Sequence, residues 1–259
     1  MFVLPPTECL MSLPLQSTVK NRILAALPPL EFALLAKHLT RIDLALGESL
    51  HRAGDPISNV FFVESGFISA LTMLSDGQPL EIGLIGAEGV AGVSVILGAT
   101  HSYSETMCQT GGGAYRITTG ELKEAVAHAP HLRDLLLRYV HVFHVQVAQT
   151  AACNAHHELG QRLARWLLAA HDRSGVAELS LTQDLIAIML GVRRSTVSIA
   201  ASTLQRAGVI RYQHGRITII DRVGLENAAC ECYEAVATEY RALFGEYPLN
   251  LAPAVSPAA

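Results

Sequence analysis

The sequence is poor in charge, in lysine and in cysteine. Only 16% of its 259 residues are charged and half are hydrophobic, a composition that excludes wholesale disorder and supplies a sizeable core. Its five cysteines are too few and too scattered for a disulfide scaffold. The N-terminal residues lack the basic region that opens a signal peptide. We therefore expect a cytoplasmic protein of one large or two ordinary domains.

Long apolar runs and the motifs of common enzymes are missing too. The most membrane-like stretch, 139–157, has no formal charge but includes four histidines, two glutamines, a threonine and an asparagine. The chain contains no G-x-S-x-G, no glycine-rich loop ending in Gly-Lys-Ser/Thr, no H-E-x-x-H and no iron-binding H-x-H. We expect neither a membrane partner nor enzyme activity, and the residues indicate no cofactor.

The charge that is present is unevenly distributed. A formal net charge of −4 argues against a nucleic-acid partner when it is averaged over the whole chain. Residues 156–221, however, hold eight arginines, no lysine and five acidic residues, a net charge of +3 that leaves −7 on the remainder. Because binding depends on the local field, this segment favours a DNA partner.

Glycine marks the N-terminal half. Thirteen of the twenty glycines lie within 47–120, where they separate short apolar runs, and Gly54-Asp55-Pro56 and Ser75-Asp76-Gly77 are strong turn signals. This spacing predicts an antiparallel, jelly-roll-like β-roll domain over 21–130, preceded by a tail over 1–20. Pro28-Pro29 should split the helical pattern before the β-roll into two short helices.

Residues 131–155 predict one long helix, because neither glycine nor proline occurs in 131–154. One set of its side chains repeats at spacings of four and three, as on the contact face of a coiled coil. A second apolar set on another face favours burial on two sides. We predict a dimerisation helix, and packing on the chain's own β-roll is the alternative. The expected dimer contacts are Leu132, Leu136, Tyr139, Phe143, Gln146, Thr150 and Cys153.

The segment 156–225 has the pattern of a winged helix-turn-helix. Thr182 can cap a helix that buries Leu185, Ile188 and Met189 and ends at Gly191. A second helix over 193–207 should bury a stripe that ends at Leu204, and two strands should flank a tight His214-Gly215 turn. A single helix over 222–245 and a low-complexity end complete a C-terminal region assigned to 226–259.

In such a motif the second helix enters the major groove with its N-terminal residues facing the base edges. Arginine can bridge guanine O6 and N7, hydroxyls reach phosphates or bases, and the hairpin reaches flanking phosphates. Ile199 and the alanines after it form a small apolar turn that is expected to lie on the helix's own core. The predicted DNA-binding residues are Thr182, Gln183, Arg193, Arg194, Ser195, Thr196, Ser198, Arg211, His214 and Arg216.

Over about residues 21–225 the chain resembles the Crp/Fnr family of bacterial transcription regulators. The specific part is LTQDLIAIMLGVRRSTVSIAASTLQRAGVIRYQHGRITIID, whereas the β-roll is similar mainly in architecture. The resemblance implies an α+β fold in which a β-roll, a long dimerisation helix and a winged helix-turn-helix follow one another. It also implies a homodimer on two-fold related double-stranded DNA, contact with RNA polymerase, and a small-molecule effector in or near the β-roll. Half-site centres would lie roughly 34 Å apart.

The chain departs from the family at the effector residues. Members that bind cyclic nucleotides carry a Gly-Glu pair and a later Arg before Ser or Thr, where this chain has Gly92-Val93 and Ser104-Glu105. No arginine lies between Arg52 and Arg116, so a cyclic phosphate would meet no fixed cation there, and we expect no cAMP binding. Oxygen-sensing members hold an iron–sulfur cluster through N-terminal cysteines, where this chain has only Cys9.

The recognition helix departs as well. The usual Glu after the first Arg is Ser195, and a later base-contacting Arg is Ile199, so family half-sites should not be transferred to this chain.

Histidine and cysteine clusters raise the question of a metal. His128/His131 and His141/His144 are spaced H-x-x-H, but no carboxylate or cysteine completes either set. The thiols of Cys230-Glu231-Cys232 would point about 200° apart on a helix, which opposes shared ligation. We therefore assign no metal site, and leave open whether the histidine-rich helix binds a metal or haem.

The sequence thus predicts a homodimeric, sequence-specific DNA-binding transcription regulator, activator or repressor, whose hinge lies near 154–159. The alternative is a ligand-sensing dimer that acts through protein contacts and has vestigial DNA binding.

Overall fold

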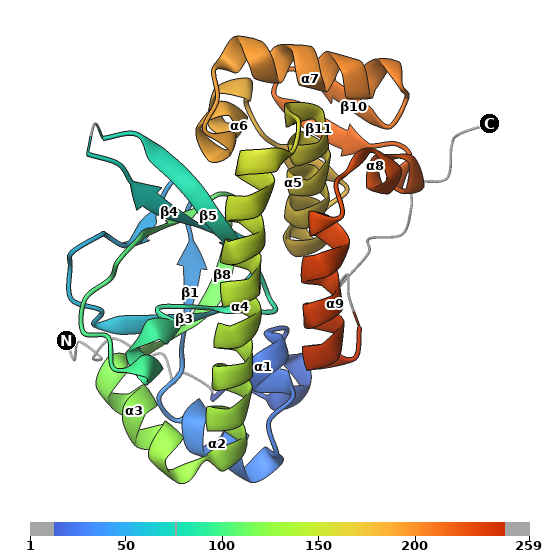
Figure 1. Cartoon of the computed structure of the whole chain (residues 1–259). Coiled ribbons are helices and arrows are strands. Elements are labelled where there is room, and N and C mark those ends of the chain that lie inside the picture. Colours follow the sequence, from blue (N-terminus) through green and yellow to red (C-terminus); the bar gives the residue numbers. More distant parts are fainter. Residues whose placement is uncertain (1–12, 76, 247–259) are drawn as a thin grey trace, which may run out of the picture.

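The structure is a computed structural model that describes residues 13–75 and 77–246. A β-roll lies beside a long helix, α4 (Pro130–His156), and the C-terminal helix-turn-helix unit sits at one end of that helix (Figure 1). Cys9 and the outer parts of both predicted tails, 1–12 and 247–259, lie outside the described residues. This mixed arrangement of antiparallel sheets and helices confirms the predicted fold class.

The β-roll consists of two four-stranded antiparallel sheets, with strand orders β1-β8-β3-β6 and β2-β7-β4-β5. The turn that contains Ser75 and Gly77 joins β4 to β5, as the turn signal predicted. The strands are β1 (Thr40–Leu44), β2 (Ser49–His51), β3 (Asn59–Ser65), β4 (Ile68–Met73), β5 (Pro79–Ile85), β6 (Val90–Ala91), β7 (Glu105–Cys108) and β8 (Gly112–Thr118).

Short helices close the β-roll at both ends of its sequence. Pro28 and Pro29 separate the first two α-helices as predicted, and Pro29 is the first residue of the second of these helices. Thr118 and Glu121 form a capping box that starts the helix before α4. These elements are η1 (Gln16–Thr18), α1 (Arg22–Ala25), α2 (Pro29–Ala36), η2 (Val93–Leu97) and α3 (Thr119–His128).

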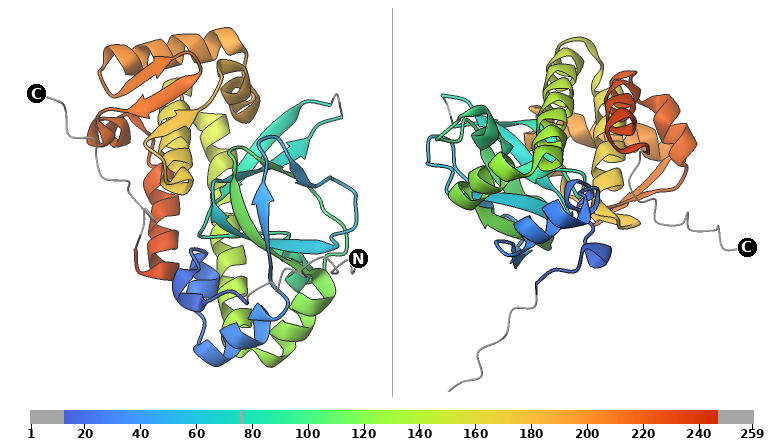
Figure 2. Two further views of the ribbon diagram at one scale, coloured as in Figure 1. Left: turned by 180° about the vertical axis from the view of Figure 1, so that it is seen from behind. Right: turned by 90° about the horizontal axis from the view of Figure 1, so that it is seen from below.

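The helix α4 is buried on two sides within its own chain. One side packs on the β-roll, where Tyr139 lies so close to Gly89 that any Cβ there would clash with its hydroxyl group. The other side packs against a C-terminal helix, α9 (Cys232–Phe244), which runs alongside α4 (Figure 2). Both neighbours contribute to one hydrophobic core with Leu132, Leu136 and Tyr139.

The predicted dimer contacts are therefore wrong for this structure, and the alternative of packing on the chain's own β-roll describes them better. The pattern of four and three is real, but its side chains fill the space between the β-roll and α9. Leu132, Leu136, Tyr139, Gln146, Thr150 and Cys153 are buried inside the chain, and Phe143 is partly buried against the same core. Periodicity identifies a buried face but does not say which neighbour buries it.

The C-terminal unit begins directly after α4. Its elements are α5 (Leu159–Ser174), β9 (Glu178–Ser180), α6 (Gln183–Leu190), α7 (Arg194–Arg206), β10 (Ile210–Gln213), β11 (Arg216–Ile219) and α8 (Arg222–Ala228). The single helix predicted over 222–245 is wrong, because the chain breaks at Ala229, Cys230 and Glu231 between α8 and α9. The predicted domain boundary at residue 225 falls inside α8.

Buried polar contacts join the C-terminal unit to the β-roll. Arg173 of α5 pairs with Glu88, at 2.6 Å from Nε to Oε1, and each side chain is only 1% exposed. Trp166 of α5 donates from Nε1 to Glu81 of β5, at 2.7 Å. Apolar side chains surround both contacts, because the core of the C-terminal unit also includes residues of β4 and β5. The two parts are therefore packed together rather than merely tethered.

Among the described residues, no single helix is long and apolar enough to cross a membrane, and only the bent pair α6 and α7 passes such a test together.

The pair of Trp166 and Glu81 predicts a pH-dependent stability. Burial raises the pKa of Glu81 to about 7, although hydrogen bonds from Ser69 and Trp166 and the charges of Arg165 and Arg173 oppose this shift. Between the ordinary value of 4.5 and about 7 the folded chain keeps a proton that the unfolded chain has lost. The free energy of unfolding should therefore fall across this window, by roughly 3 kcal/mol at most, and level off above it.

In Glu81→Gln this contribution should disappear, as measured by urea unfolding between about pH 5 and 8. Glu124→Gln, on the exposed side of α3, is the control and should keep the wild-type profile. An unchanged slope in Glu81→Gln would contradict the assignment.

Candidate nucleic-acid interface

A short helix and a longer one form the centre of the C-terminal unit. The helices α6 and α7 meet at 105°, within the usual range for a helix-turn-helix. Thr182 caps α6 by accepting a hydrogen bond from the Leu185 N–H, and Gly191 ends it with a positive φ of 62° that suits glycine. Both features were predicted from the sequence. The predicted burial of Ile188 is wrong, because this side chain is exposed and its neighbour Ala187 is buried.

The first turns of α7 present polar side chains to the outside. Val197, Ala200, Ala201 and Leu204 are buried as predicted, so the opposite side of the helix is free of core contacts. That side carries Arg193, Arg194, Ser195 and Thr196, all exposed. In Figure 1, α7 is at the outer end of the molecule, at the opposite end of α4 from α2 and α3.

Ile199 is the residue of this surface that sequence reasoning missed. It was expected to lie on the core, but its side chain is 69% exposed on the same side as Thr196. The sequence did contain a signal for this exposure, because Ile199 follows Thr196 by three residues and residues three and four apart share a helix face.

Two contacts fix α6 against α7. The Ser198 hydroxyl donates to Oε1 of Gln183 at 2.5 Å, and Nε of Arg194 lies 3.6 Å from Oδ1 of Asp184. Ser198 and Gln183 are therefore tied to each other, and they position the helices more directly than they offer free groups. The Arg194 pair is exposed on both sides, so its net stabilisation is small and Arg194 can exchange partners.

The wing is a three-stranded antiparallel sheet with the order β10-β11-β9. His214 and Gly215 both have positive φ, 51° and 76°, so the tight turn predicted from the sequence is present. Arg211 is exposed on β10, while Nη1 of Arg216 pairs with Oε1 of Glu178 at 3.1 Å. Arg211, unlike Arg216, has no ion-pair partner among the described residues.

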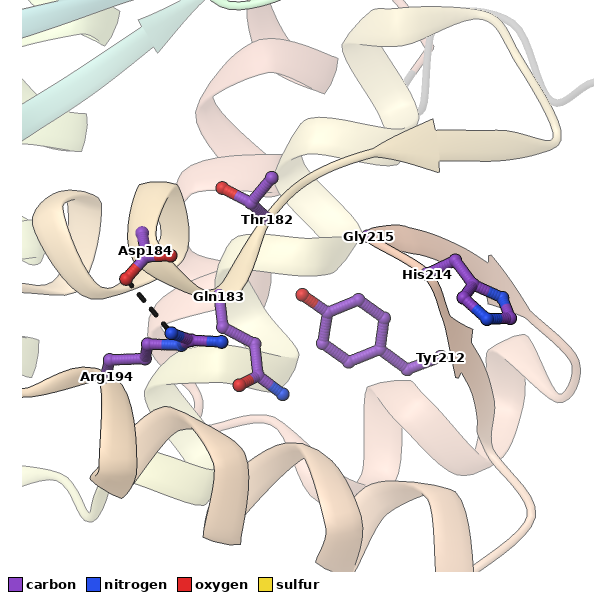
Figure 3. Close-up of a pocket in the computed structure, with 7 residues that line it drawn as sticks. All are labelled: Thr182, Gln183, Asp184, Arg194, Tyr212, His214 and Gly215. Atoms are coloured by element: carbon purple, nitrogen blue, oxygen red, sulfur yellow. Dashed lines mark ion pairs between the residues drawn. The ribbon is translucent and has the colours of Figure 1, made fainter.

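The wing and the start of α6 enclose a shallow cleft. Figure 3 shows Gln183, Arg194 and Tyr212 arranged around it, with the Asp184–Arg194 pair at its edge. Tyr212 donates from its hydroxyl to the Leu181 carbonyl at 2.9 Å, which holds its ring against the cleft. The cleft therefore brings together residues of α6, α7 and the wing. Four of them were predicted to bind DNA, namely Thr182, Gln183, Arg194 and His214, and Asp184 and Tyr212 lie beside them.

The positive charge of the unit is smaller on the surface than the sequence count indicated. Arg165 and Arg173 are buried beside acidic residues of the β-roll, and Arg162 is partly buried and donates to the Leu190 carbonyl of α6. The exposed arginines are Arg193, Arg194, Arg206, Arg211 and Arg216, and they lie on α7 and the wing. The predicted local basicity is therefore confined to these two elements.

The interior of the β-roll is filled next to Gly92, where the family resemblance implied a phosphate site. The buried His51 ring approaches Gly92 and is held by two contacts, 2.8 Å to Oγ1 of Thr106 and 2.9 Å to the Asn59 carbonyl. Burial lowers the pKa of His51, which favours the neutral ring. The two arginines of the β-roll segment, Arg52 and Arg116, are both exposed.

One histidine of each H-x-x-H pair lies near an acidic residue, and the two acidic residues are different. His131 is 2.6 Å from Glu31, and His141 is 3.7 Å from Glu239. The cysteine prediction is wrong in its geometry: Cys230 precedes α9 instead of lying on a helix, so its thiol converges with that of Cys232. Cys153 and His157 meet them there.

The electrostatics of this cysteine cluster are uneven. Burial raises the pKa of the Cys230 thiol to about 12. At Cys153 burial acts in the same direction, but the charge of Arg165 and hydrogen bonds from His157 and the other thiols outweigh it and lower the pKa.

The comparisons agree with the geometry of the C-terminal unit. The model of the Crp-like helix-turn-helix domain matches residues 161–228, from α5 to the end of α8. A CRP-like cAMP-activated global transcriptional regulator of Mycobacterium tuberculosis is 24% identical over 214 residues, which cover 80% of this chain and 96% of that protein.

Two solved structures share the fold. FixK2 of Bradyrhizobium japonicum has a TM-score of 0.65 at 18% identity, covering 74% of this chain and 98% of that one. A transcriptional regulator of the Crp/Fnr family from Eubacterium rectale has a TM-score of 0.63 at 18% identity, covering 79% and 95%.

The domain match covers the helices whose exposed side carries the polar residues, and the relatives cover both the β-roll and this unit. The chain is a DNA-binding transcription regulator with a Crp-like helix-turn-helix domain over 161–228, and over most of its length it is similar to regulators of the Crp/Fnr type.

Proposed function

We propose that two copies of the chain bind a two-fold related double-stranded DNA site, with α7 of each copy in the major groove. The observation that carries this proposal is the exposed N-terminal half of α7 beside a wing that carries its own arginines. Arg193 is exposed and, among the described residues, has no ion-pair partner, so its guanidinium is available for a guanine edge. Exposure of this surface does not favour vestigial DNA binding.

Phosphate contacts are assigned to the cleft and the wing. The N-terminus of α6, with its unpaired backbone N–H groups and positive dipole end, opens on the cleft next to Thr182 and Gln183. Arg211 and His214 extend the same side along the wing. These contacts would set the register of the protein on DNA without reading its sequence.

Base reading is assigned to the residues that point outward from α7. Arg193, Ser195 and Thr196 supply donors and acceptors, and Ile199 supplies an apolar group suited to a thymine methyl. The presence of Ile199 at this place supports a site that differs from those of relatives with an arginine there.

Replacing Arg193 and Arg194 by Ala together should weaken binding to a site selected from random DNA, by about 1–3 kcal/mol for each base-reading arginine. A gel-shift titration and a footprint measure this loss. Arg52→Ala, an exposed arginine of the β-roll, is the matched control and should bind as the wild type does. Unchanged affinity and footprint in the double variant would show that α7 is not the recognition helix.

We place the dimer contact on α4 one residue after each contact that was predicted from the sequence. The remaining side of α4 carries Leu137, Val140, His144, Val147 and Ala151, each one residue after a predicted contact. Leu137 lies at the edge of this side, where it also lines a cleft with Glu239 and Leu243 of α9. These positions repeat at three and four and are exposed or half-buried, with Leu137 at 39%. We assign the two-fold contact of the homodimer to this face.

Leu137→Glu combined with Ala151→Glu should convert the dimer to a monomer, because the carboxylates of the two copies would meet across the contact. Size-exclusion chromatography with light scattering measures the mass, and Lys123→Glu on exposed α3 controls for added negative charge. A doubly substituted chain that stays dimeric would place the contact elsewhere.

The effector and the link to transcription are also proposals. An effector in or near the β-roll would change how the β-roll packs on α4 and α5, and so re-aim the two copies of α7. The chain bends at His157 and Glu158, between α4 and α5 and inside the expected hinge span, which supports this route. Contact with RNA polymerase would convert DNA binding into regulation.

cAMP should not be this effector. Because His51 fills the space at Gly92, and because Arg52 and Arg116 on either side of this stretch are exposed, a cyclic phosphate would find neither room nor a cation. Isothermal titration calorimetry should show no binding at micromolar cAMP, while the cAMP-activated Mycobacterium tuberculosis relative serves as the positive control. Micromolar affinity for cAMP would overturn this expectation.

A further inference from the structure

Four possible metal ligands come together where the long helix meets the C-terminal unit. Cys153 is in the last turn of α4, His157 caps that helix, and Cys230 and Cys232 flank the break before α9. The ligand atoms of the four side chains all lie within 4.8 Å of one another. The three cysteines are buried and the histidine is partly buried.

Two of the distances inside this cluster are close to the edges of a tetrahedron around a zinc ion. Sγ of Cys153 lies 3.4 Å from Sγ of Cys230, and Sγ of Cys232 lies 3.5 Å from Nδ1 of His157. Zn–S bonds of about 2.3 Å and Zn–N bonds of about 2.0–2.1 Å give tetrahedral edges of roughly 3.4–3.8 Å. Little movement would therefore be needed to bring the four atoms around one ion.

The side chains that contact the four possible ligands are arranged like those that surround the ligands of zinc in other proteins. Glu231 places Oε1 at 3.2 Å from Nε2 of His157, which orients the ring so that Nδ1 faces the thiols. Gln149 donates from Nε2 to Sγ of Cys232 at 3.3 Å. A carboxylate on the far nitrogen of a ligating histidine and a hydrogen bond to a ligating atom are common features of metal sites.

Two arginines next to the cluster form no direct ion pair among the described residues. The Nε atoms of Arg162 and Arg165 are buried and have no hydrogen-bond partner among the described residues. Both guanidinium groups interact electrostatically with the Cys153 thiol. Three thiolates and a neutral histidine around a divalent ion carry one net negative charge, which would balance this positive surrounding.

We propose that Cys153, His157, Cys230 and Cys232 bind one Zn²⁺ ion in a closed tetrahedral site of the structural type. The donor set of three sulfurs and one imidazole is one that zinc prefers, and it leaves no open position for a substrate. The bound ligands are three thiolates and one neutral ring. Binding therefore releases three protons per ion, either from three thiols beside a neutral His157, or from two thiols and a charged His157 when the third thiol has already passed its proton to the ring.

The ion would join two breaks of the chain, the one between α4 and α5 and the one between α8 and α9, into one rigid point. His157 comes directly before Glu158, the N-cap residue of α5. The two C-terminal cysteines would hold the start of α9 against α4. Loss of the ion would remove this restraint on the hinge and on α9, while the contacts of Arg173 and the apolar core remain. The regulatory part of this inference, that zinc tunes operator binding, rests on the proposed function, whereas metal binding itself does not.

The metal is tested on the full chain purified under reducing conditions. Elemental analysis after gel filtration should give one zinc per chain, and replacement by Co²⁺ should give the absorption bands of tetrahedral cobalt with sulfur-to-metal charge transfer. Cys153→Ser, Cys230→Ser and Cys232→Ser should each abolish these bands. Cys108→Ser, which removes a buried thiol of the β-roll, is the matched control and should retain them.

The second layer gives a graded test. Glu231→Gln should lower zinc affinity by about 10–100-fold in competition with a chromophoric chelator. His157→Asn should lower it further, whereas His156→Asn, its exposed neighbour, should leave it unchanged.

If the cysteine variants do not fold, alkylation mapping of the wild-type chain replaces them. Zinc should protect Cys153, Cys230 and Cys232 from iodoacetamide, and a chelator should remove this protection. Zinc that is lost on gel filtration, cobalt bands without sulfur character, or a Cys153–Cys230 disulfide in the chain as purified under reducing conditions would each overturn the proposal.

The regulatory part has its own readout. Operator affinity should change when the wild-type chain is stripped of zinc and recover when zinc is restored. Stoichiometric zinc with unchanged operator affinity would leave the site standing as structural and refute the regulatory part alone.

Discussion

Arg173 is the residue at which four parts of the molecule meet. From α5 its guanidinium pairs with Glu88 of the β-roll and donates from Nη2 to Oε1 of Gln146 on α4, at 3.1 Å. It also lies over the ring of Tyr240 on α9, at 5.3 Å to the ring centre. The orientation of the DNA-binding helices therefore depends on a charge buried between the β-roll, the long helix and the C-terminal helix.

A buried charge of this kind favours one arrangement over others. Its desolvation is unfavourable unless every partner is in place, and removing one partner of a buried pair typically costs about 3–5 kcal/mol. The C-terminal unit cannot turn on its hinge at His157 and Glu158 while Arg173 keeps Glu88, Gln146 and Tyr240 together. A regulatory signal has to act on this contact or leave it intact and act on the two-fold contact of the dimer.

The parts that could be predicted from the sequence are those determined by neighbouring residues. Thr182 and Gly191 start and end α6, and His214-Gly215 forms the wing turn, because caps and turns depend on a few adjacent groups. The stripe of α7 that ends at Leu204 was predicted for the same reason. The architecture of the helix-turn-helix unit follows from such local signals.

What could not be predicted depends on contacts between distant segments. The repeat on α4 showed a buried face, but α9, which lies about a hundred residues later, decided what covers it. The inward turn of Arg165 and Arg173 depends in the same way on acidic residues of the β-roll. At Ile199 the error was one of helix phase, since a shift of one position moves a side chain by about 100°.

The cysteines show how one local error conceals a distant site. A continuous helix over 222–245 would point the thiols of Cys230 and Cys232 apart, and that argument was sound for a helix. The break before α9 turns Cys230 back towards α4, where Cys153 and His157 already lie together, because they are separated by one helical turn. A pair with i, i+4 spacing on α4 and a C-x-C at a helix start therefore form one cluster. Neither pair indicates the cluster by itself, because the cluster forms only when α9 packs against α4.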